Sequence, residues 1–312
     1  MSLKLAIVLT TRNRPQNLQL ALESICNNSV LPETISIVSS GENINNTLTK
    51  YLKLTDIVHE HVTIEGQYHQ RQVALNKVIH NHDLILLMDD YNILENNFIY
   101  ECITSFSKLE NNIVGMGVTI VNHAIAQPRL KNIRRLIHNY SPEGGMVLKS
   151  GIGIPYQNLE KYSSTEWLNG SSVWRSFIFN EFKHVEMNGT YAAAEDLIFS
   201  YPISKKYKLI TNNDLKLMHG KRNIKTSKFF WRAFKTNLHR LFFVEQHQEL
   251  SKMWFYINLI LSTFFSLLIF LRIVSFKSLF TLLGNILSIP FLVLYELLRI
   301  FRCTSSRWLL SF

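Results

Sequence analysis

Residues 84–91 read LILLMDDY, a short apolar run that ends in two carboxylates. The run Leu84–Met88 predicts a buried strand, because it is continuous, apolar and too short for a helix. Further strands are expected at Leu5–Leu9, Ile35–Val38, Val62–Ile64 and Ile113–Val121, and helices at Asn17–Asn27 and Tyr68–His80. Strands that alternate with helices predict an α/β domain whose mostly parallel sheet has helices on both faces. The stretch Gln127–Ser164 is expected to be a long irregular connection, and such loops are often functional.

Polar side chains follow three of these strands at the point where each strand ends. Thr10-Thr11-Arg12 follows the first strand, Ser39-Ser40-Gly41 the second, and Asp89-Asp90 the Leu84–Met88 strand. In an open α/β sheet, ligands bind at the carboxyl ends of the strands. Hydroxyls, a cation and two carboxylates at one edge indicate a nucleotide with its phosphates and a metal ion.

Composition and charge exclude several classes of protein. The chain has 312 residues, of which 47% are hydrophobic and 18% charged, so general disorder is excluded. Its three cysteines cannot pair evenly and show no metal-binding spacing, so a disulfide scaffold is excluded as well.

The net charge of +10 lies in residues 221–312, which hold 13 Lys and Arg against 3 Glu, while residues 1–220 hold 20 of each sign. A neutral body with a basic tail argues against nucleic-acid binding and favours an anionic membrane surface.

Two uncharged apolar runs, Met253–Leu271 and Ser278–Tyr295, have lengths of 19 and 18 residues. A spanning helix needs about 20 apolar residues, so both runs qualify narrowly. The basic segment 221–252 precedes them, and the positive-inside rule then predicts a membrane hairpin with the body of the protein in the cytosol. The alternative is a pair of helices that lie on the membrane, because the apolar runs are interrupted by Asn258, Asn285 and Pro290. Leu5–Leu9 is too short for a signal peptide.

Four later motifs complete the pattern. They are Trp167-Leu168-Asn169-Gly170, Arg175, Ala194-Glu195-Asp196 and His219. With the opening Val8–Pro15 and the Leu86–Tyr91 stretch, in this order, the sequence resembles glycosyltransferase family 2 over about residues 3–220. That family has the GT-A fold and uses nucleotide-sugar donors. The resemblance divides the chain into a catalytic domain (1–220), a basic juxtamembrane segment (221–252) and a membrane hairpin with a basic tail (253–312).

The resemblance implies an inverting hexosyl- or deoxyhexosyltransferase with defined residue roles. Asp196, helped by Glu195, is the expected catalytic base, because the acceptor hydroxyl must lose its proton as it attacks. The expected donor-binding residues are Thr10, Thr11, Arg12, Ser39, Arg71, Asp89 and Asp90. The expected acceptor-binding residues are Trp167, Gly170 and Arg175. A divalent Mg²⁺ or Mn²⁺ ion is expected on Asp90, with His219 as a further ligand.

Two residues depart from the family pattern. Tyr91 stands where the family often has a third acidic residue, which predicts weak metal binding. Ser39 stands where the family commonly has an aspartate that binds the base, so the base is left open. Glu195 and Asp196 could also serve only to stabilise a helix start, and Arg71 could be a solvated helix arginine.

Three functions remain open at this stage. The first is transfer of a sugar to a lipid-linked or cell-surface glycan at the cytosolic face of the cell membrane, as in polysaccharide biosynthesis. The second is a polyprenyl-phosphate sugar synthase, whose phosphate acceptor needs no general base. The third is an inactive scaffold that binds sugar nucleotides. Expected partners are the donor, the acceptor and membrane lipids, without nucleic acid, and the membrane helices could mediate an oligomer.

Overall fold

The computed structural model describes residues 3–52, 55–64, 66–122, 131–136, 139–156, 160–187, 193–220, 228–301 and 303–312. The chain divides into two compact units. The first unit consists of Met1–Ala126, Pro155–Val185 and Glu195–Arg222, and the second of Gln127–Ile154, Glu186–Ala194 and Asn223–Phe312. Parts of two predicted segments, residues 127–130, 137–138 and 157–159 of the long connection and residues 221–227 of the basic segment, lie outside the described residues.

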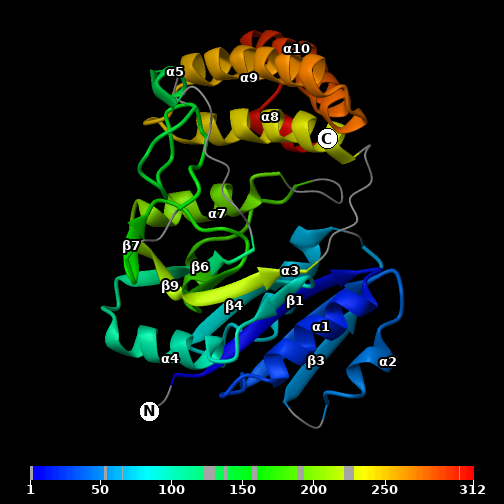
Figure 1. The fold of residues 1–312 in the computed structure, drawn as a ribbon, viewed down its shortest axis with the longest axis vertical. Coiled ribbons are helices and arrows are strands. Elements are labelled where there is room, and N and C mark those ends of the chain that lie inside the picture. The colour runs from blue at the N-terminus through cyan, green and yellow to red at the C-terminus, as the bar shows by residue number, and fades with distance from the viewer. Residues whose placement is uncertain are drawn as a thin grey trace. The chain divides into compact units, whose positions relative to one another are not determined.

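The elements of the first unit alternate between strands and helices along most of its length (Figure 1). They are β1 (Leu5–Arg12), α1 (Pro15–Cys26), β2 (Thr34–Ser40), α2 (Asn45–Leu48), β3 (Asp56–His61), α3 (Gln67–Asn76), β4 (Leu84–Asp89), β5 (Asn92–Leu94), α4 (Phe98–Lys108), β6 (Ile113–Ile120), β7 (Tyr162–Thr165), β8 (Ser172–Arg175), α6 (Ile178–Glu181), α7 (Glu195–Ser204) and β9 (Lys208–His219). The second unit contains α5 (Lys131–Leu136), α8 (Lys228–Gln246), α9 (Lys252–Ile273), α10 (Phe276–Ile300) and the 3₁₀ helix η1 (Ser306–Leu310).

The strands of the first unit form one mixed sheet with the order β3-β2-β1-β4-β8-β6-β9-β5, and β7 pairs with β9. The strands from β3 to β4 are parallel, whereas β8 runs antiparallel to both of its neighbours, β4 and β6. The α/β class is therefore confirmed, and the sheet is mixed: its long pairings are parallel and its short pairings antiparallel. The short strands β5, β7 and β8 account for the antiparallel pairings among the described residues.

Both faces of the sheet are covered, as predicted, because side chains of a strand alternate between its two faces. In β1, Leu5, Ile7 and Leu9 pack in one core cluster with α1 and α4. Ala6 and Val8 face the other cluster, which contains residues of α3, α6 and α7. β4 repeats this alternation, so the predicted buried strands form the centre of both cores.

The third strand lies earlier in the chain than predicted. β3 covers Asp56–His61 and pairs in parallel with β2, whereas Val62–Ile64 follows it. The prediction failed because β3 is the last strand on its side of the sheet, with side chains that are half-buried or exposed. Its sequence DIVHEH therefore lacks the continuous apolar run that marks a buried strand. The predicted long connection contains α5 and β7 in its described part.

The second unit is built on three long helices. α9 and α10 are both long and apolar enough to cross a membrane by length and composition, with mean hydropathies of 2.0 and 1.8. α8 forms from the described part of the predicted basic segment. Its buried residues include Phe234, Leu238, Leu241 and Phe242 at helical spacing, while Lys228 and Arg232 are exposed, so α8 buries an apolar side.

Candidate active site

The polar ends of three strands lie together at one edge of the sheet. The parallel register places Thr10 of β1 beside Asp89 of β4 and Thr11 beside Ser39 of β2. Arg12, which is half-buried, comes beside Ser40 at the end of the same ladder. The predicted donor-binding residues of these three strands therefore share one edge, as a parallel sheet requires.

Asp90 is buried behind this edge and is already paired. Its two carboxylate oxygens accept hydrogen bonds from Thr11 Oγ1 at 2.7 Å and from Arg14 Nη1 at 2.9 Å. Burial raises the pKa of Asp90, and the neighbouring Arg14 guanidinium opposes that rise. Asp90 thus ties β4 to β1 and to the start of α1. Metal binding by Asp90 stays a prediction that this arrangement does not favour.

Asp89 is the more accessible carboxylate, with 18% of its side chain exposed. It accepts hydrogen bonds from Tyr91 Oη at 2.5 Å and from Gln67 Nε2 at 3.1 Å. The Tyr91 ring contacts the ring of His219 edge-on at 5.1 Å, and β5 pairs with the end of β9 where His219 lies. The Tyr91 phenol thus contacts both Asp89, a predicted donor-binding residue, and His219, a predicted metal ligand.

The helix α3 presents three polar side chains on one face at positions i, i+3 and i+4. Gln67 contacts Asp89, Gln70 donates to the main-chain carbonyls of Thr11 and Val38, and Arg71 forms a buried ion pair. Gln70 thereby joins the ends of β1 and β2. Arg71 was predicted from the sequence as a site residue and the two glutamines were not, although their helical spacing with Arg71 was a usable signal.

Arg71 links the strand edge to the beginning of α7. Its Nη1 lies 2.6 Å from Glu195 Oε1, and its Nη2 lies 3.9 Å from Asp89 Oδ1. Burial raises the pKa of Glu195, and the Arg71 charge opposes that rise. His184, which sequence reasoning missed, lies with Nδ1 3.5 Å from Glu195 and stacks on Phe199. Burial lowers the pKa of His184 well below its ordinary value, so the ring is neutral.

Asp196 occupies the first turn of α7 and is half-buried. One carboxylate oxygen accepts a hydrogen bond from the Leu197 amide at 2.9 Å. Burial raises the pKa of Asp196 to about 6. A carboxylate with that pKa is ionised at neutral pH and is a better proton acceptor than an ordinary aspartate, which suits it to general-base chemistry.

The loop Trp167–Gly170 is held close to Asp196 by one hydroxyl group. Ser200 Oγ donates to the Asp196 carbonyl at 2.6 Å and accepts from the Leu168 amide at 2.9 Å. Gly170 is open, with nothing within 4 Å of the place where a Cβ would stand. The side-chain oxygen of Asn169 is buried and has no hydrogen-bond partner among the described residues. Asn169 is a further candidate for acceptor binding that the role assignment did not include.

Arg175 lies away from the other predicted site residues. β8 runs antiparallel to β4, with Ser172 beside Leu87 and Arg175 beside Leu84. The strand therefore carries Arg175 toward the opposite edge of the sheet, about 10 Å beyond Ser172 at ~3.3 Å per residue. Its Nε donates to the carbonyl of Ile113 at 3.0 Å. Acceptor binding by Arg175 stays a prediction that this placement does not favour.

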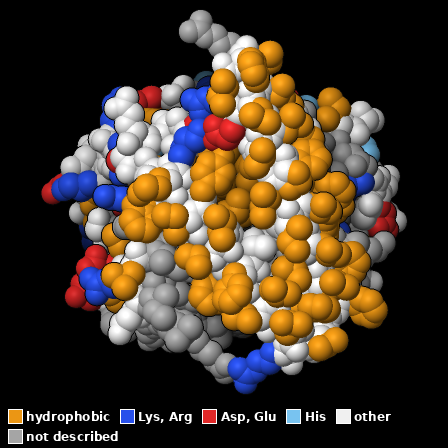
Figure 2. Space-filling model, turned by 90° about the horizontal axis from the view of Figure 1, so that it is seen from above, with side chains coloured by type: hydrophobic (Ala, Val, Ile, Leu, Met, Phe, Trp, Pro, Cys, Tyr) orange, Lys and Arg blue, Asp and Glu red, His pale blue; other side chains and the backbone are white. Residues whose placement is uncertain are grey.

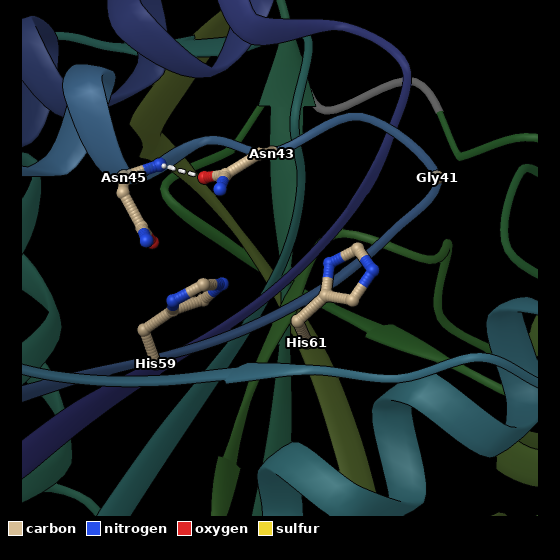
Figure 3. A pocket seen from close by; sticks show the side chains of 5 residues that line it. All are labelled: Gly41, Asn43, Asn45, His59 and His61. Carbon is tan, nitrogen blue, oxygen red and sulfur yellow. Dashed lines mark hydrogen bonds between the residues drawn. The ribbon is translucent and has the colours of Figure 1, made fainter.

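Ser39 is fully buried between two histidines of β3. Its hydroxyl lies 2.9 Å from Nε2 of His59 and 3.1 Å from Nδ1 of His61. The histidines, together with Gly41, Asn43 and Asn45, line a pocket of about 130 Å³ (Figure 3). Burial lowers the pKa of His59, so its ring is neutral near pH 7. Imidazole and amide groups, rather than a carboxylate, thus form this end of the site.

A substitution at Gly41 tests the loop that forms the pocket. Gly41 has a φ of +79°, and an added Cβ would stand 2.2 Å from Asn13 Oδ1, which accepts a hydrogen bond from the Glu42 amide. We expect Gly41→Ala to reduce the free energy of unfolding by about 1–3 kcal/mol, because the backbone is strained and the Asn13 bond is displaced. Denaturant unfolding measures this, with Gly170→Ala, which has free space, as the matched control. Equal stability of the two variants would contradict the prediction.

The metal site expected from the sequence is only partly supported by these contacts. No group of three or more His, Cys, Asp or Glu side chains that could hold a metal is found in the described residues. Of the two predicted carboxylates Asp89 and Asp90, Asp89 is the more exposed at the strand edge, with 18% of its side chain exposed against 3% for Asp90. Mg²⁺ and Mn²⁺ can bind through one carboxylate and the phosphates of a substrate, so Asp89 fits such an ion but does not form a cage for it.

Comparison with known proteins finds solved structures that are similar to this chain. No protein-family model and no curated protein sequence matches the chain. Among solved structures it is similar to S. aureus TarS, with a TM-score of 0.52 and 12% identity over 84% of this chain and 43% of TarS. It is also similar to the mannosyltransferase PcManGT from Pyrobaculum calidifontis, solved with GDP-Man and Mn²⁺ (TM-score 0.55, 10% identity, 92% of this chain, 74% of that one). A third similar structure is GalNAc-T7 with UDP, GalNAc and Mn²⁺ (TM-score 0.53, 13% identity, 82% and 54%).

Because the sequence identities are low, these matches show a similar fold and carry no conclusion about function. The chain spans less than half of the length of TarS, so the match says nothing of the remainder of that protein. The sheet and the strand-edge site agree with what the motifs of the sequence imply. The chain therefore has a mixed-sheet α/β fold of the GT-A glycosyltransferase type, extended by two long apolar helices in its C-terminal part.

Proposed function

We propose that the chain is an inverting glycosyltransferase that moves a sugar from a nucleotide-sugar donor to an acceptor hydroxyl. The observation that carries this proposal is Asp196, a half-buried carboxylate whose pKa burial raises to about 6. It stands at the start of α7, beside the Glu195–Arg71 pair that reaches Asp89, and Ser200 ties it to the Trp167–Gly170 loop. The base, the strand edge and the loop are thus linked by short contacts.

In the proposed reaction, the acceptor hydroxyl gives its proton to the Asp196 carboxylate. Its oxygen then forms a bond to the anomeric carbon while the bond from that carbon to the diphosphate breaks. A single displacement of this kind inverts the anomeric centre. Negative charge develops on the leaving diphosphate, and positive groups must stabilise it. Arg12, at the end of β1, is the candidate protein group for that task.

A divalent cation, when bound, would neutralise charge on the diphosphate, and Asp89 is the side chain that would hold it. Tyr91, at the position of the family's third acidic residue, donates a hydrogen bond to this carboxylate. We therefore propose a weakly held metal. In this proposal His59 and His61, with Ser39, form hydrogen bonds to the edge of the nucleobase in the pocket of Figure 3. That pocket is smaller than the ~300–1,000 Å³ of a complete ligand site, so it fits a part of the donor.

The acceptor is proposed to be a lipid-linked or cell-surface glycan, because α9 and α10 are long and apolar and the C-terminal part of the chain is basic. We propose that these helices keep the transferase at the cytosolic face of the cell membrane. A polyprenyl-phosphate sugar synthase is the second candidate, since it would also work at a membrane. The geometry around Asp196 favours a hydroxyl acceptor, because a phosphate acceptor needs no base.

A donor screen tests the function. The full-length chain in detergent is incubated with UDP-, GDP- and dTDP-sugars and a membrane lipid extract, with Mn²⁺, Mg²⁺ or EDTA. We expect release of one nucleoside diphosphate together with a lipid product heavier by one sugar. Asp196→Asn should stop both, whereas Asp214→Asn, an exposed aspartate paired with Lys161, should not.

The outcomes separate the candidate functions. Transfer to a polyprenyl phosphate that survives Asp196→Asn would establish the synthase instead. Donor binding without turnover in any extract would indicate a scaffold protein. Full activity in EDTA would remove the metal from the proposal and assign the leaving-group charge to basic side chains.

A further inference from the structure

The second unit exposes a continuous apolar face. Hydrophobic side chains gather over α9 and α10, with Lys and Arg side chains at the margins of that face (Figure 2). The large hydrophobic residues that are about half exposed or more include Ile260, Phe264, Leu271, Val293 and Leu297. Only 17% and 33% of the most apolar windows of α9 and α10 are buried. An apolar surface of this kind marks a contact with another molecule or with lipid.

The other side of α10 is packed along α8. The Phe234 and Phe291 rings meet at 5.1 Å, and Asn237 Nδ2 donates to Asn285 and Ser288 at 3.1 and 3.0 Å. At Gly284 the helices approach so closely that an added Cβ would stand 2.4 Å from the Phe230 carbonyl oxygen. The missing side chain thus permits the contact.

The order of these contacts shows that α8 and α10 run in the same direction. Phe230 lies at Gly284, and Glu245, fifteen residues later, bonds with Tyr295 and Arg299. Lys277, in the first turn of α10, lies over the ring of Phe229 at 4.9 Å. The beginning of α8 is therefore at the same end as the turn between α9 and α10, and its last turn is beside the last turns of α10.

This packing bears on whether the hairpin crosses a bilayer. If α9 and α10 crossed, α8 would lie at the same depth and would have to cross with them. α8 carries the exposed Lys228 and Arg232 and the buried Lys235 and Arg240, and it is not among the candidate membrane spans in the described part of the chain. Basic and amide side chains at the centre of a bilayer are expensive, and such residues are rare in spanning segments. The three-helix unit is therefore unsuited to crossing.

We propose that the α9–α10 face lies flat in one anionic membrane leaflet and that α8 stays on its aqueous side, so the hairpin does not cross the bilayer. The inference rests on the membrane association proposed above and specifies its geometry. The face would insert by about 5–10 Å, as interfacial helices do. Arg272 and Lys277 are exposed at one end of the hairpin and Arg299 at the other, where they can meet lipid phosphates. The +10 charge of residues 221–312 favours an anionic leaflet.

Thiol labelling from each side of the membrane tests the topology. One full-length chain keeps the exposed native Cys303 but carries Cys26→Ser, while Cys102 remains buried. A second adds Lys277→Cys and Cys303→Ser, which moves the accessible thiol to the turn between α9 and α10. Both are expressed in a bacterial host, and a membrane-impermeant maleimide is added to intact spheroplasts and to inside-out vesicles.

We expect both thiols to be labelled in inside-out vesicles and both to be protected in spheroplasts. Labelling of the residue-277 thiol in spheroplasts, with Cys303 labelled only in inside-out vesicles, would show a crossing hairpin and overturn the proposal. Labelling of the residue-277 thiol only after detergent would also overturn it, because that thiol would then lie in the hydrocarbon. Recovery of the chain entirely in the soluble fraction would overturn the membrane association as well.

Vesicle flotation of the purified chain gives a second measurement that does not need cysteine variants. Binding to vesicles of 70% phosphatidylcholine and 30% phosphatidylglycerol should exceed binding to pure phosphatidylcholine at least tenfold. Phe264→Glu should lower binding at least tenfold, whereas Leu20→Glu, at a similarly exposed position of α1, should change it less than twofold. Equal losses in both variants would contradict a specific face. Neither assay measures sugar transfer, so a failed transferase proposal and a failed topology are distinguishable.

Discussion

Asp196→Asn is expected to lower kcat for sugar transfer by about 10²–10⁴-fold, the usual contribution of a general base, while donor affinity changes by no more than a few-fold. The amide keeps the size of the carboxylate and can still accept from the Leu197 amide. It cannot take the proton of the acceptor hydroxyl. Single-turnover kinetics with donor in excess, beside donor titration by calorimetry, separate the chemical step from binding.

The pH dependence of the wild-type enzyme follows from the same residue. Burial raises the pKa of Asp196 to about 6, and the base works only when it is ionised. We therefore expect kcat to rise with pH up to about 6 and to level off above it, with a tenfold loss for each pH unit below. An ordinary aspartate would place this limb near pH 4. A flat profile between pH 5 and 7 would remove Asp196 from the rate-determining proton transfer.

The exposed residue Asp214 provides the control for this variant. Asp214→Asn removes one negative charge from the same unit and breaks the pair with Lys161, but it lies on β9, outside the residues proposed to act. Its kcat should stay within about twofold of wild type. An Asp196→Asn enzyme that retains most of its turnover would favour a phosphate acceptor, which needs no base.

The central strands could be predicted from the sequence because burial on both faces makes them continuously apolar. Leu84–Met88 and Leu5–Leu9 are of this kind, and both became strands of the core. The edge strand β3 could not be found in this way, because its side chains are half-buried or exposed. The mixed direction of the sheet was not predictable either, since it depends on the short strand β8 inserted between β4 and β6.

The strand-edge residues could be predicted for a topological reason, since parallel strands bring their carboxyl ends to one edge. The partners of Asp89 and Asp90 could not be predicted, because they depend on the placement of Arg14 and Tyr91 within hydrogen-bond distance. Arg175 lies elsewhere. It is close in sequence to the acceptor loop, but an antiparallel strand takes it toward the other edge of the sheet. Sequence proximity to a motif therefore did not imply proximity in space.

The buried ion pair between Arg71 and Glu195 is expected to have the largest effect on stability. The exposed fractions of these side chains are 4% and 6%, and the pair joins α3 to α7 at 2.6 Å. Removing one partner of a buried pair leaves an uncompensated charge, which typically costs about 3–5 kcal/mol of unfolding free energy. We expect Arg71→Met to lose about that amount at pH 7, and the double variant with Glu195→Gln to lose less than Arg71→Met alone.

The loss of unfolding free energy in Arg71→Met should change with pH in one direction. The pKa of Glu195 is raised in the folded protein by burial, and the Arg71 charge opposes that rise. A carboxyl group whose pKa is higher in the folded chain than in the unfolded chain is buried more easily when it is protonated. Its ionisation therefore destabilises the fold as the pH rises above 4.5, the ordinary pKa of the group. Without the Arg71 charge, ionisation of the buried Glu195 destabilises the fold more strongly. The difference in unfolding free energy between wild type and Arg71→Met should therefore narrow as the pH falls.

Urea unfolding of the full-length chain in detergent at several pH values measures the difference, with Lys77→Met as the matched control. Lys77 pairs with Glu60 at 2.7 Å near the end of the same helix, but both side chains are about one-third exposed or more. Loss of such a surface pair costs about 0–1 kcal/mol. Additive losses in Arg71→Met and Glu195→Gln would mean that the two residues do not act as a pair. Coupled losses would show that the Arg71 charge, which holds Glu195 beside the proposed base Asp196, also holds α7 against the end of the sheet. The position of the proposed base and the stability of the fold would then depend on the same contact.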